Sequence, residues 1–243
     1  MVKWEGRKSK GCRNNIFIVN GIIHDVVNKK GRKPVLLQIY DYAQMFDSIE
    51  LKQAISDIYE TGLDDDNLSL VYNANKEIFM AVNSPGELTD RQPVTDIVLQ
   101  GETWSSLLAS VQVDKIVKEC QNADIGYKYK ENLSIGLLGL VDDLIGVTEV
   151  GYQAQMMNSF MNVRTAEKCL QFGIKKCHTM LIGDKSDCIV DNELSVDKWI
   201  VSYTDTEVKE EFVGPVTIGK CSEQKYLALS YQILEVTCLI SEH

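Results

Sequence analysis

Apolar residues follow two kinds of spacing along this chain, and the two alternate from the N-terminal region onward. Short unbroken apolar runs predict buried strands, and apolar residues that recur every three or four positions predict amphipathic helices. The expected strands cover residues 35–40, 77–82, 94–99, 135–141, 144–147 and 179–182. The expected helices cover 48–59, 67–75, 104–120 and 152–172, after a first helix capped by Asn14 or Asn15 and stopped by Gly31.

The order of these elements predicts an α+β fold. Asp142 and Asp143 alone separate two apolar runs, which predicts a hairpin because two-residue turns favour residues that tolerate positive φ. The order of strand, helices, hairpin strands, helix and strand fits a small antiparallel sheet with helices on one face, the ferredoxin-like arrangement. A boundary is expected near Gly183, because residues 184–243 show a different pattern with strand-like pieces such as 199–203.

The composition fits an intracellular globular protein. Of the 243 residues, 44% are hydrophobic, which allows a sizeable core and argues against global disorder. No apolar run approaches the ~18 residues that a membrane span needs, and no apolar stretch directly follows the basic N-terminus, so neither a membrane partner nor a secretion signal is expected. The seven Cys include no C-x-x-C pair and suit free thiols in the cytoplasm or nucleus.

The charge is distributed unevenly along the chain. The formal net charge is −10, yet residues 1–33 hold nine Lys or Arg against two acidic residues, a balance of +7 that leaves −17 for the remainder. A nucleic-acid-binding protein normally carries a basic footprint, and only this first segment offers one. A solvated N-terminal tail has the same composition. Charge alone therefore leaves both interpretations open.

Three carboxylates stand at the ends of predicted buried strands. Asp41 directly follows the strand 35–40, and Asp142 and Asp143 form the tip of the apolar hairpin. Carboxylates with apolar flanks are costly to bury unless a partner compensates their charge, and Mg²⁺ prefers oxygen ligands of this kind. Two such ions ~4 Å apart can promote an in-line phosphoryl transfer. An isolated Asp-Asp pair is more often a simple turn, so the apolar flanks are what favour a metal site here.

Short motifs in a fixed order around these carboxylates resemble those of reverse transcriptases, most closely the type found in non-LTR retrotransposons. Asp41 precedes Phe46-Asp47-Ser48 after a spacer, and Leu140-Val141-Asp142-Asp143 is similar to the aromatic-x-Asp-Asp motif. The other matching segments are Arg7-Lys8-Ser9-Lys10, Gln100-Gly101 with Ser105, Lys175-Lys176 with Met180 and Gly183, and Gln224-Lys225-Tyr226-Leu227. Each motif is weak alone, and their shared order over residues 5–228 carries the resemblance.

The resemblance implies an RNA-directed DNA polymerase. Its ferredoxin-like polymerase palm would cover residues 34–183, after a partial fingers segment over 1–33 and before a C-terminal segment, 184–243, with a primer-grip-like strand. Its cofactors would be two Mg²⁺ ions, or Mn²⁺ in their place. Its partners would be an RNA or DNA template with a primer, and deoxynucleoside triphosphates. The metal ligands that it implies are Asp41, Asp142 and Asp143.

The resemblance also assigns contacts with the substrate. Phe46 would lie beneath the incoming sugar and exclude a 2′-hydroxyl, although an ordinary core aromatic fits the same position. Lys176 would approach the leaving pyrophosphate as a general acid or electrostatic partner, with a solvated helix end as the alternative. The remaining contacts implied are Gln100 and Gly101 at the pocket for template base and nucleotide, and Arg7 and Lys10 at the template backbone.

The sequence also departs from the family. Leu99 stands where a basic residue is usual, Glu102-Thr103 replaces Asp-Pro, and Val141 replaces Ala. The fingers are cut short before Arg7, so the expected palm is truncated. These departures favour an alternative, a non-catalytic retroelement-derived domain that binds nucleic acid or protein. A second alternative is another metal-dependent phosphotransferase that uses the same three Asp, although no phosphate-binding loop is recognisable.

Overall fold

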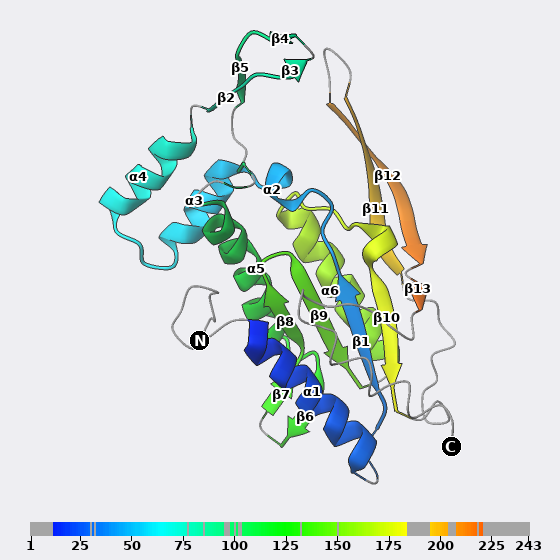
Figure 1. The fold of residues 1–243 in the computed structure, drawn as a ribbon. Coiled ribbons are helices and arrows are strands. Elements are labelled where there is room, and N and C mark those ends of the chain that lie inside the picture. The colour runs from blue at the N-terminus through cyan, green and yellow to red at the C-terminus, as the bar shows by residue number, and fades with distance from the viewer. Residues whose placement is uncertain are drawn as a thin grey trace.

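An antiparallel sheet forms the centre of the fold (Figure 1). The structure, a computed structural model, describes residues 12–29, 31, 33–76, 78–84, 86–94, 98–99, 101, 104–131, 133–149, 151–183, 195–203, 208–217 and 219–220. Within these residues the main sheet has five strands, in the spatial order β13 (Gly219–Lys220), β10 (His178–Ile182), β1 (Val35–Tyr40), β9 (Asp143–Thr148) and β8 (Leu137–Leu140). Among the described strands of this sheet, β13 alone pairs in parallel, with β10. Part of the chain after residue 183 therefore joins the main sheet.

The predicted hairpin is present, but its turn lies one residue earlier than expected. Leu140 pairs with Asp143, so the turn residues are Val141 and Asp142. Val141 has a φ of +54°, which is unfavourable for a β-branched residue. The register of the strands decides this outcome, because the pairing of β8 with β9 leaves only Val141 and Asp142 outside the ladder.

The longer helices agree with the predicted ranges except at their ends, whereas the two short helices, 45–48 and 174–176, were not predicted. They are α1 (Cys12–Asn28), α2 (Met45–Ser48), α3 (Leu51–Tyr59), α4 (Asp65–Asn75), α5 (Ser105–Asn122), α6 (Gly151–Glu167) and the short 3-10 helix η1 (Ile174–Lys176). The helix expected over 48–59 is interrupted, because Ile49 and Glu50 adopt extended backbone between α2 and α3. The helix expected over 152–172 ends at Glu167.

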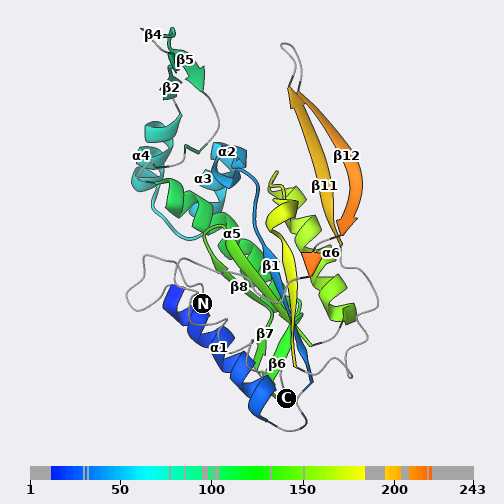
Figure 2. The ribbon, with the colours of Figure 1, turned by 45° about the vertical axis from the view of Figure 1, so that its right-hand side comes forward.

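Helices cover both faces of the sheet, so the expectation of helices on one face is wrong. Leu36 and Tyr40 of β1 belong to an apolar cluster with α3, α5 and α6. Val35, Leu37 and Ile39 point the other way and pack with residues of α1, which Figure 2 shows across the sheet from α6. Every residue of β1 is buried as a result. Its nearly continuous apolar sequence is typical of a strand that is covered on both sides.

A buried polar network fixes α6 to the sheet. Gln38, the polar residue of β1, donates from Nε2 to the carbonyl of Ala154 at 2.8 Å and to Oδ1 of Asn158 at 2.6 Å. The Tyr40 hydroxyl donates to the same Asn158 oxygen at 2.6 Å. Polar groups in a core must find partners to offset the loss of water, so these bonds restrict where α6 can lie on the strands.

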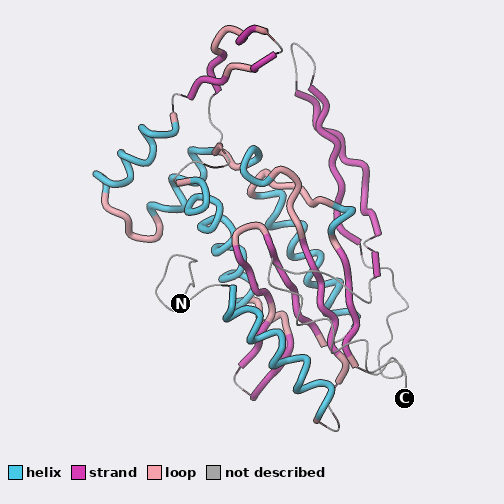
Figure 3. Tube along the Cα trace, viewed as in Figure 1, coloured by secondary structure: helices cyan, strands magenta, loops and turns pink. Residues whose placement is uncertain are grey.

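Smaller hairpins surround this core (Figure 3). The pairs are β2 (Ile78–Met80) with β5 (Gln92–Val94), β3 (Asn83–Ser84) with β4 (Glu87–Leu88), β6 (Tyr127–Lys130) with β7 (Leu133–Ile135), and β11 (Ser195–Tyr203) with β12 (Val208–Thr217). The first two form an arm beyond α4, where strands were predicted over 77–82 and 94–99. Residues 98–99 are not part of a strand, and the β6–β7 hairpin was not predicted.

Candidate active site

Asp41 is held by a short ladder at the end of the central strand. It follows β1 directly, and its carbonyl accepts a hydrogen bond from the Gly173 amide at 2.8 Å. Two residues further on, the Ala43 amide donates to the Gln171 carbonyl at 2.8 Å. Between them Tyr42 pairs with Phe172, and their rings stack with centroids 5.7 Å apart. The backbone on both sides of the Asp41 carboxylate is therefore fixed.

Lys176 lies beside this carboxylate. Its Nζ is 3.1 Å from Oδ1 and 3.4 Å from Oδ2 of Asp41. The Lys176 side chain is 70% exposed and that of Asp41 is 21% exposed, so the pair sits at the surface end of the sheet. An ion pair this open to water contributes little to stability, because water screens the attraction. The lysine is thus near Asp41 without being locked to it.

Asp142 and Asp143 lie next to Asp41 across the sheet. Tyr40 of β1 pairs with Leu144 of β9 in antiparallel register. Asp41, which follows Tyr40, and Asp143, which precedes Leu144, are therefore neighbours at the end of the sheet. Asp142 occupies the turn and is exposed, whereas Asp143 is half-buried. Two segments about a hundred residues apart in sequence thus meet through the strand register.

The pKa of Asp143 shows that these groups act on one another. This pKa is raised from 3.8 to about 6, first by burial and then by the negative charges of Asp142 and Asp41, against the opposing effect of Lys176. Like charges disfavour ionisation of a neighbouring carboxyl, so the two acidic neighbours add to the effect of burial. The structure therefore brings Asp41, Asp142, Asp143 and Lys176 to the same end of the sheet, and their roles stay predictions.

The donors of this site fit a hard divalent cation. Carboxylate oxygens are the ligands that Mg²⁺ and Mn²⁺ prefer, and three carboxylates lie at this end of the sheet. In the described part of the chain, however, no group of three His, Cys, Asp or Glu side chains is arranged closely enough to hold a metal ion. The Lys176 ammonium lies beside the Asp41 carboxylate, so a cation bound there would be repelled by its positive charge.

Two residues that the sequence did not single out support Asp41. A Cβ at Gly173 would come within 3.0 Å of the Asp41 Oδ1, so a larger side chain would press on this carboxylate. Cys177 is buried beneath the same residue and donates from Sγ to the Asp41 carbonyl at 3.7 Å. Burial raises the pKa of the Cys177 thiol to about 11, so it remains protonated. Only the position of Gly173 just before the Lys pair could have indicated a role.

The predicted substrate contacts are only partly described. Phe46 lies in α2, half-buried and packed against the main apolar cluster, five residues after Asp41. Gly101 is exposed with a φ of +92°, a backbone conformation that favours glycine. Arg7, Lys10, Gln100 and residues 224–227 lie outside the described residues.

The comparisons with known proteins rest on structure. No protein-family model and no curated protein matches the sequence. Telomerase from Candida tropicalis, solved in complex with the TWJ fragment of telomeric RNA, matches with a TM-score of 0.54 at 15% identity over 81% of this chain and 32% of that one. The chain has a reverse-transcriptase-like fold. Apo telomerase from the same species, truncated from the C-terminal domain, matches with a TM-score of 0.50 at 17% identity over 82% and 40% of the two chains.

The two matches cover only part of each telomerase chain. The chain spans well under half of each telomerase, so the common part is one region of those proteins. At such identity the likeness concerns the fold. It leaves the more specific resemblance to non-LTR retrotransposons as a prediction. Among the described helices, none is both long and apolar enough to cross a membrane.

Proposed function

We propose that this chain is an RNA-directed DNA polymerase domain of the non-LTR retrotransposon type, built on a ferredoxin-like palm. The strand order β10-β1-β9-β8, with α5 between β1 and β8 and α6 between β9 and β10 in sequence, supports the ferredoxin-like arrangement. The observation that carries the proposal is the convergence of Asp41, Asp142 and Asp143 with Lys176 at one end of this sheet, within a reverse-transcriptase-like fold.

The carboxylates and the lysine take different roles in this proposal. Asp41, Asp142 and Asp143 would hold two Mg²⁺ ions, or Mn²⁺ in their place, which would activate the attacking 3′-hydroxyl and stabilise the leaving oxygen. Lys176 would leave Asp41 and neutralise the departing pyrophosphate, because its long exposed side chain is free to turn. Asp143 must lose its proton to bind a cation, so activity should fall as the pH drops through about 6.

The substrates would be an RNA or DNA template with a primer, and deoxynucleoside triphosphates. The basic residues of the 1–33 segment, Arg7 and Lys10 among them, would contact the template, and Gln100 with Gly101 would line the nucleotide pocket. The remainder of the chain carries −17, which repels phosphate. Binding of the template should therefore be weak, and it should weaken strongly with added salt.

The test is primer extension on an RNA template with Mg²⁺, for the wild-type chain and Asp142→Ala. We expect extension by the wild type and a loss of about a thousandfold or more in the variant, since charge neutralisation at the transferred phosphate is nearly all that the protein supplies. Glu131→Ala is the control, because it removes a carboxylate from the exposed turn between β6 and β7, outside the main sheet. Equal activity of wild type and Asp142→Ala would refute the metal-binding role.

Phe46→Ala tests the proposed choice of sugar. Phe46 lies five residues after Asp41 and is only half-buried, so part of its ring is open to a ligand beside Asp41. Removing the ring should let ribonucleotides enter about tenfold more readily relative to deoxynucleotides, because a steric clash worth ~1.4 kcal/mol is lost. The measurement is the ratio of kcat/KM for the two sugars. An unchanged ratio would assign Phe46 to the core alone.

A second candidate is a non-catalytic, retroelement-derived domain that binds nucleic acid or protein. The observation that favours it is the pairing of Asp41 with Lys176, in a site where no described carboxylate group is arranged to hold a metal. In that case primer extension should be absent from the wild type. Deletion of residues 1–13 should then abolish nucleic-acid binding, since it removes five of the nine basic residues of the 1–33 segment.

A further inference from the structure

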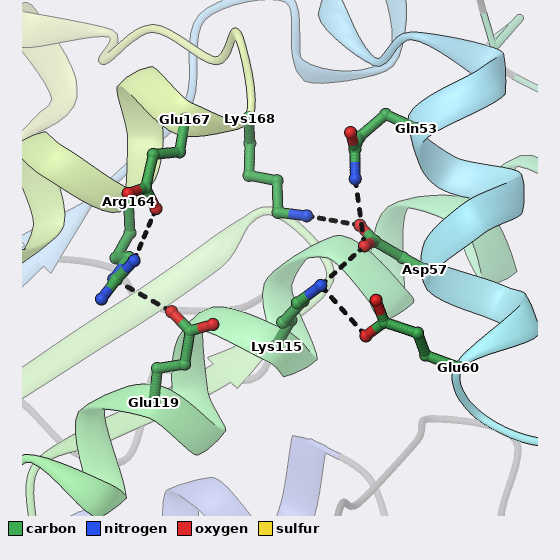
Figure 4. Close-up of polar contacts among 8 residues, drawn as sticks. All are labelled: Gln53, Asp57, Glu60, Lys115, Glu119, Arg164, Glu167 and Lys168. Carbon is green, nitrogen blue, oxygen red and sulfur yellow. Dashed lines mark hydrogen bonds and ion pairs between the residues drawn. The ribbon is translucent and has the colours of Figure 1, made fainter.

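A second group of charged side chains lies away from the candidate active site (Figure 4). Its centre is Asp57 of α3, a carboxylate that is 2% exposed. Lys168, beyond the end of α6, approaches Oδ2 of Asp57 at 2.5 Å, and Lys115 of α5 approaches Oδ1 at 3.0 Å. Lys168 is itself only 10% exposed on its side chain. One buried carboxylate thus connects three helices.

Lys168 occupies a defined position at the end of α6. The Leu170 amide donates to the Thr165 carbonyl at 3.0 Å, and the Cys169 amide donates to the Ala166 carbonyl at 3.0 Å. Cys169 has a φ of +56°. These bonds and this conformation make a Schellman motif, in which Lys168 is the last residue before the chain reverses. Its position therefore sets the direction in which residues 169–176 leave the helix.

The segment that leaves α6 leads directly to Asp41. Residues 171–173 form the ladder with residues 41–43, and Lys176 then reaches the Asp41 carboxylate. In the other direction, the chain runs from Asp41 through α2 into α3, which carries Asp57. The contact of Asp57 with Lys168 consequently completes a closed ring made of segments 41–57 and 168–173. The two segments are joined at one end by the ladder beside Asp41 and at the other end by the buried ion pair.

A buried ion pair restricts the positions of its side chains more than it stabilises the fold. Two desolvated charges gain little over well-packed apolar side chains of similar size, but they tolerate only a narrow range of positions. The two ammonium groups arrive from separate helices, and Gln53 adds a hydrogen bond to Oδ1 of Asp57 at 3.2 Å. Asp57 is therefore held from several sides and can act as a fixed point for the end of α6.

We propose that Asp57 and Lys168 are positioning residues that hold segment 169–176 against Asp41, and thereby set the place of Lys176 in the active site. The structural part of this proposal, that the two residues anchor the segment, is supported by the contacts described above. The catalytic part, the placing of Lys176, rests on the proposed polymerase function.

Hydrogen exchange tests the structural part in the full chain. The variant is Lys168→Met, which keeps the length of the side chain and removes its charge. We expect the amides of Ala43 and Gly173 to exchange about tenfold faster or more, because their bonds belong to the ladder of the ring, while the amide of Leu37 in the central strand stays within about twofold. Lys168→Arg should restore the wild-type rates, since it keeps the charge.

Arg164→Met is the matched control, because Arg164 lies one turn earlier on α6 and pairs with Glu119 at 2.9 Å in a more exposed position. This variant should leave the rates of Ala43 and Gly173 unchanged. If Lys168→Met fails to fold, the double variant Asp57→Asn and Lys168→Met removes both charges together and is measured in its place. Unchanged rates at Ala43 and Gly173, or an equal increase at Leu37, would overturn the proposal.

Primer extension then separates the two ideas. If the wild type extends primers, Lys168→Met should lower kcat about tenfold with little change in KM for the primed template, and Lys168→Arg should recover the activity. An unaltered kcat beside faster exchange would refute the catalytic part. An inactive wild type would refute the proposed function, and the exchange rates would still decide whether Asp57 and Lys168 anchor the segment.

Discussion

Two clusters of carboxylates and lysines sit on the same scaffold and differ in their balance of charge. Around Asp57, the side chains of Lys115 and Lys168 surround a single buried carboxylate. Around Asp41, the carboxylates of Asp142 and Asp143 lie near the pair of Asp41 with Lys176, whose side chain is 70% exposed. The acid of the first cluster is buried against two lysines, whereas the carboxylates of the second repel one another at the end of a buried strand.

The pKa shifts in the two clusters follow this difference. Burial acts to lower the pKa of Lys115, but its hydrogen bonds to Asp57 and Glu60 outweigh that effect and raise the pKa, so the ammonium stays charged. The pKa of Asp143 is raised to about 6 by burial and by its acidic neighbours, so its ionised form is disfavoured. Mutual repulsion among carboxylates is typical of sites that receive a cation or a proton, whereas a carboxylate buried against lysines is typical of a structural contact.

The largest expected effect comes from breaking the compensated cluster. Asp57→Ala leaves the buried Lys168 without its acid and Lys115 with only the exposed Glu60, which should lower the free energy of unfolding by about 3–5 kcal/mol. Asp41→Ala should change it by less than about 1 kcal/mol, because the ion pair of Asp41 with Lys176 is exposed to water. Urea denaturation of both variants measures the contrast. Equal losses would show that the two clusters do not differ in this way.

A smaller effect is expected from Asp143→Asn. The pKa of Asp143 in the folded protein is about 6, above its ordinary 3.8, so the unfolded chain releases this proton first as the pH rises. The resulting cost to stability develops between about pH 4 and pH 6 and is fully present above pH 6. The variant should therefore be more stable at pH 8 by about 1 kcal/mol, after allowing for partial exposure, and no more stable at pH 4. Urea titrations at the two pH values decide it, and an equal gain at both would contradict the assigned pKa.

The smallest effect is expected at the exposed charges of α6. Arg164 pairs with Glu119 at 2.9 Å and Glu167 at 2.6 Å, and all three side chains are at least one-third exposed. Arg164→Met should change the free energy of unfolding by less than about 1 kcal/mol, and added salt should reduce the difference. Thermal denaturation at low and high salt provides the measurement. A loss as large as that of Asp57→Ala would mean that exposure does not distinguish these pairs.

The sequence by itself determined the elements that local physics controls. The unbroken apolar run 35–40 is β1, residue for residue, because a strand buried at every position needs no alternation. The amphipathic spacing located α1, α4 and α5 to within a few residues. Asp41, Asp142 and Asp143 could be selected because acidic residues beside apolar strands demand compensation. The roles assigned to them remain predictions.

Tertiary structure decided what depends on long-range pairing. The register of β8 with β9 places Val141 in the turn, although its β-branched side chain disfavours a φ of +54°. The partner of Asp57 lies 111 residues away, so no local pattern could reveal that Lys168 compensates its charge. The approach of Gly173 to Asp41 likewise exists only once the end of α6 meets the end of β1. The spacing of apolar residues along the chain indicates on which face of a helix or strand a residue lies. Which residues become its neighbours depends on how the helices and strands pack.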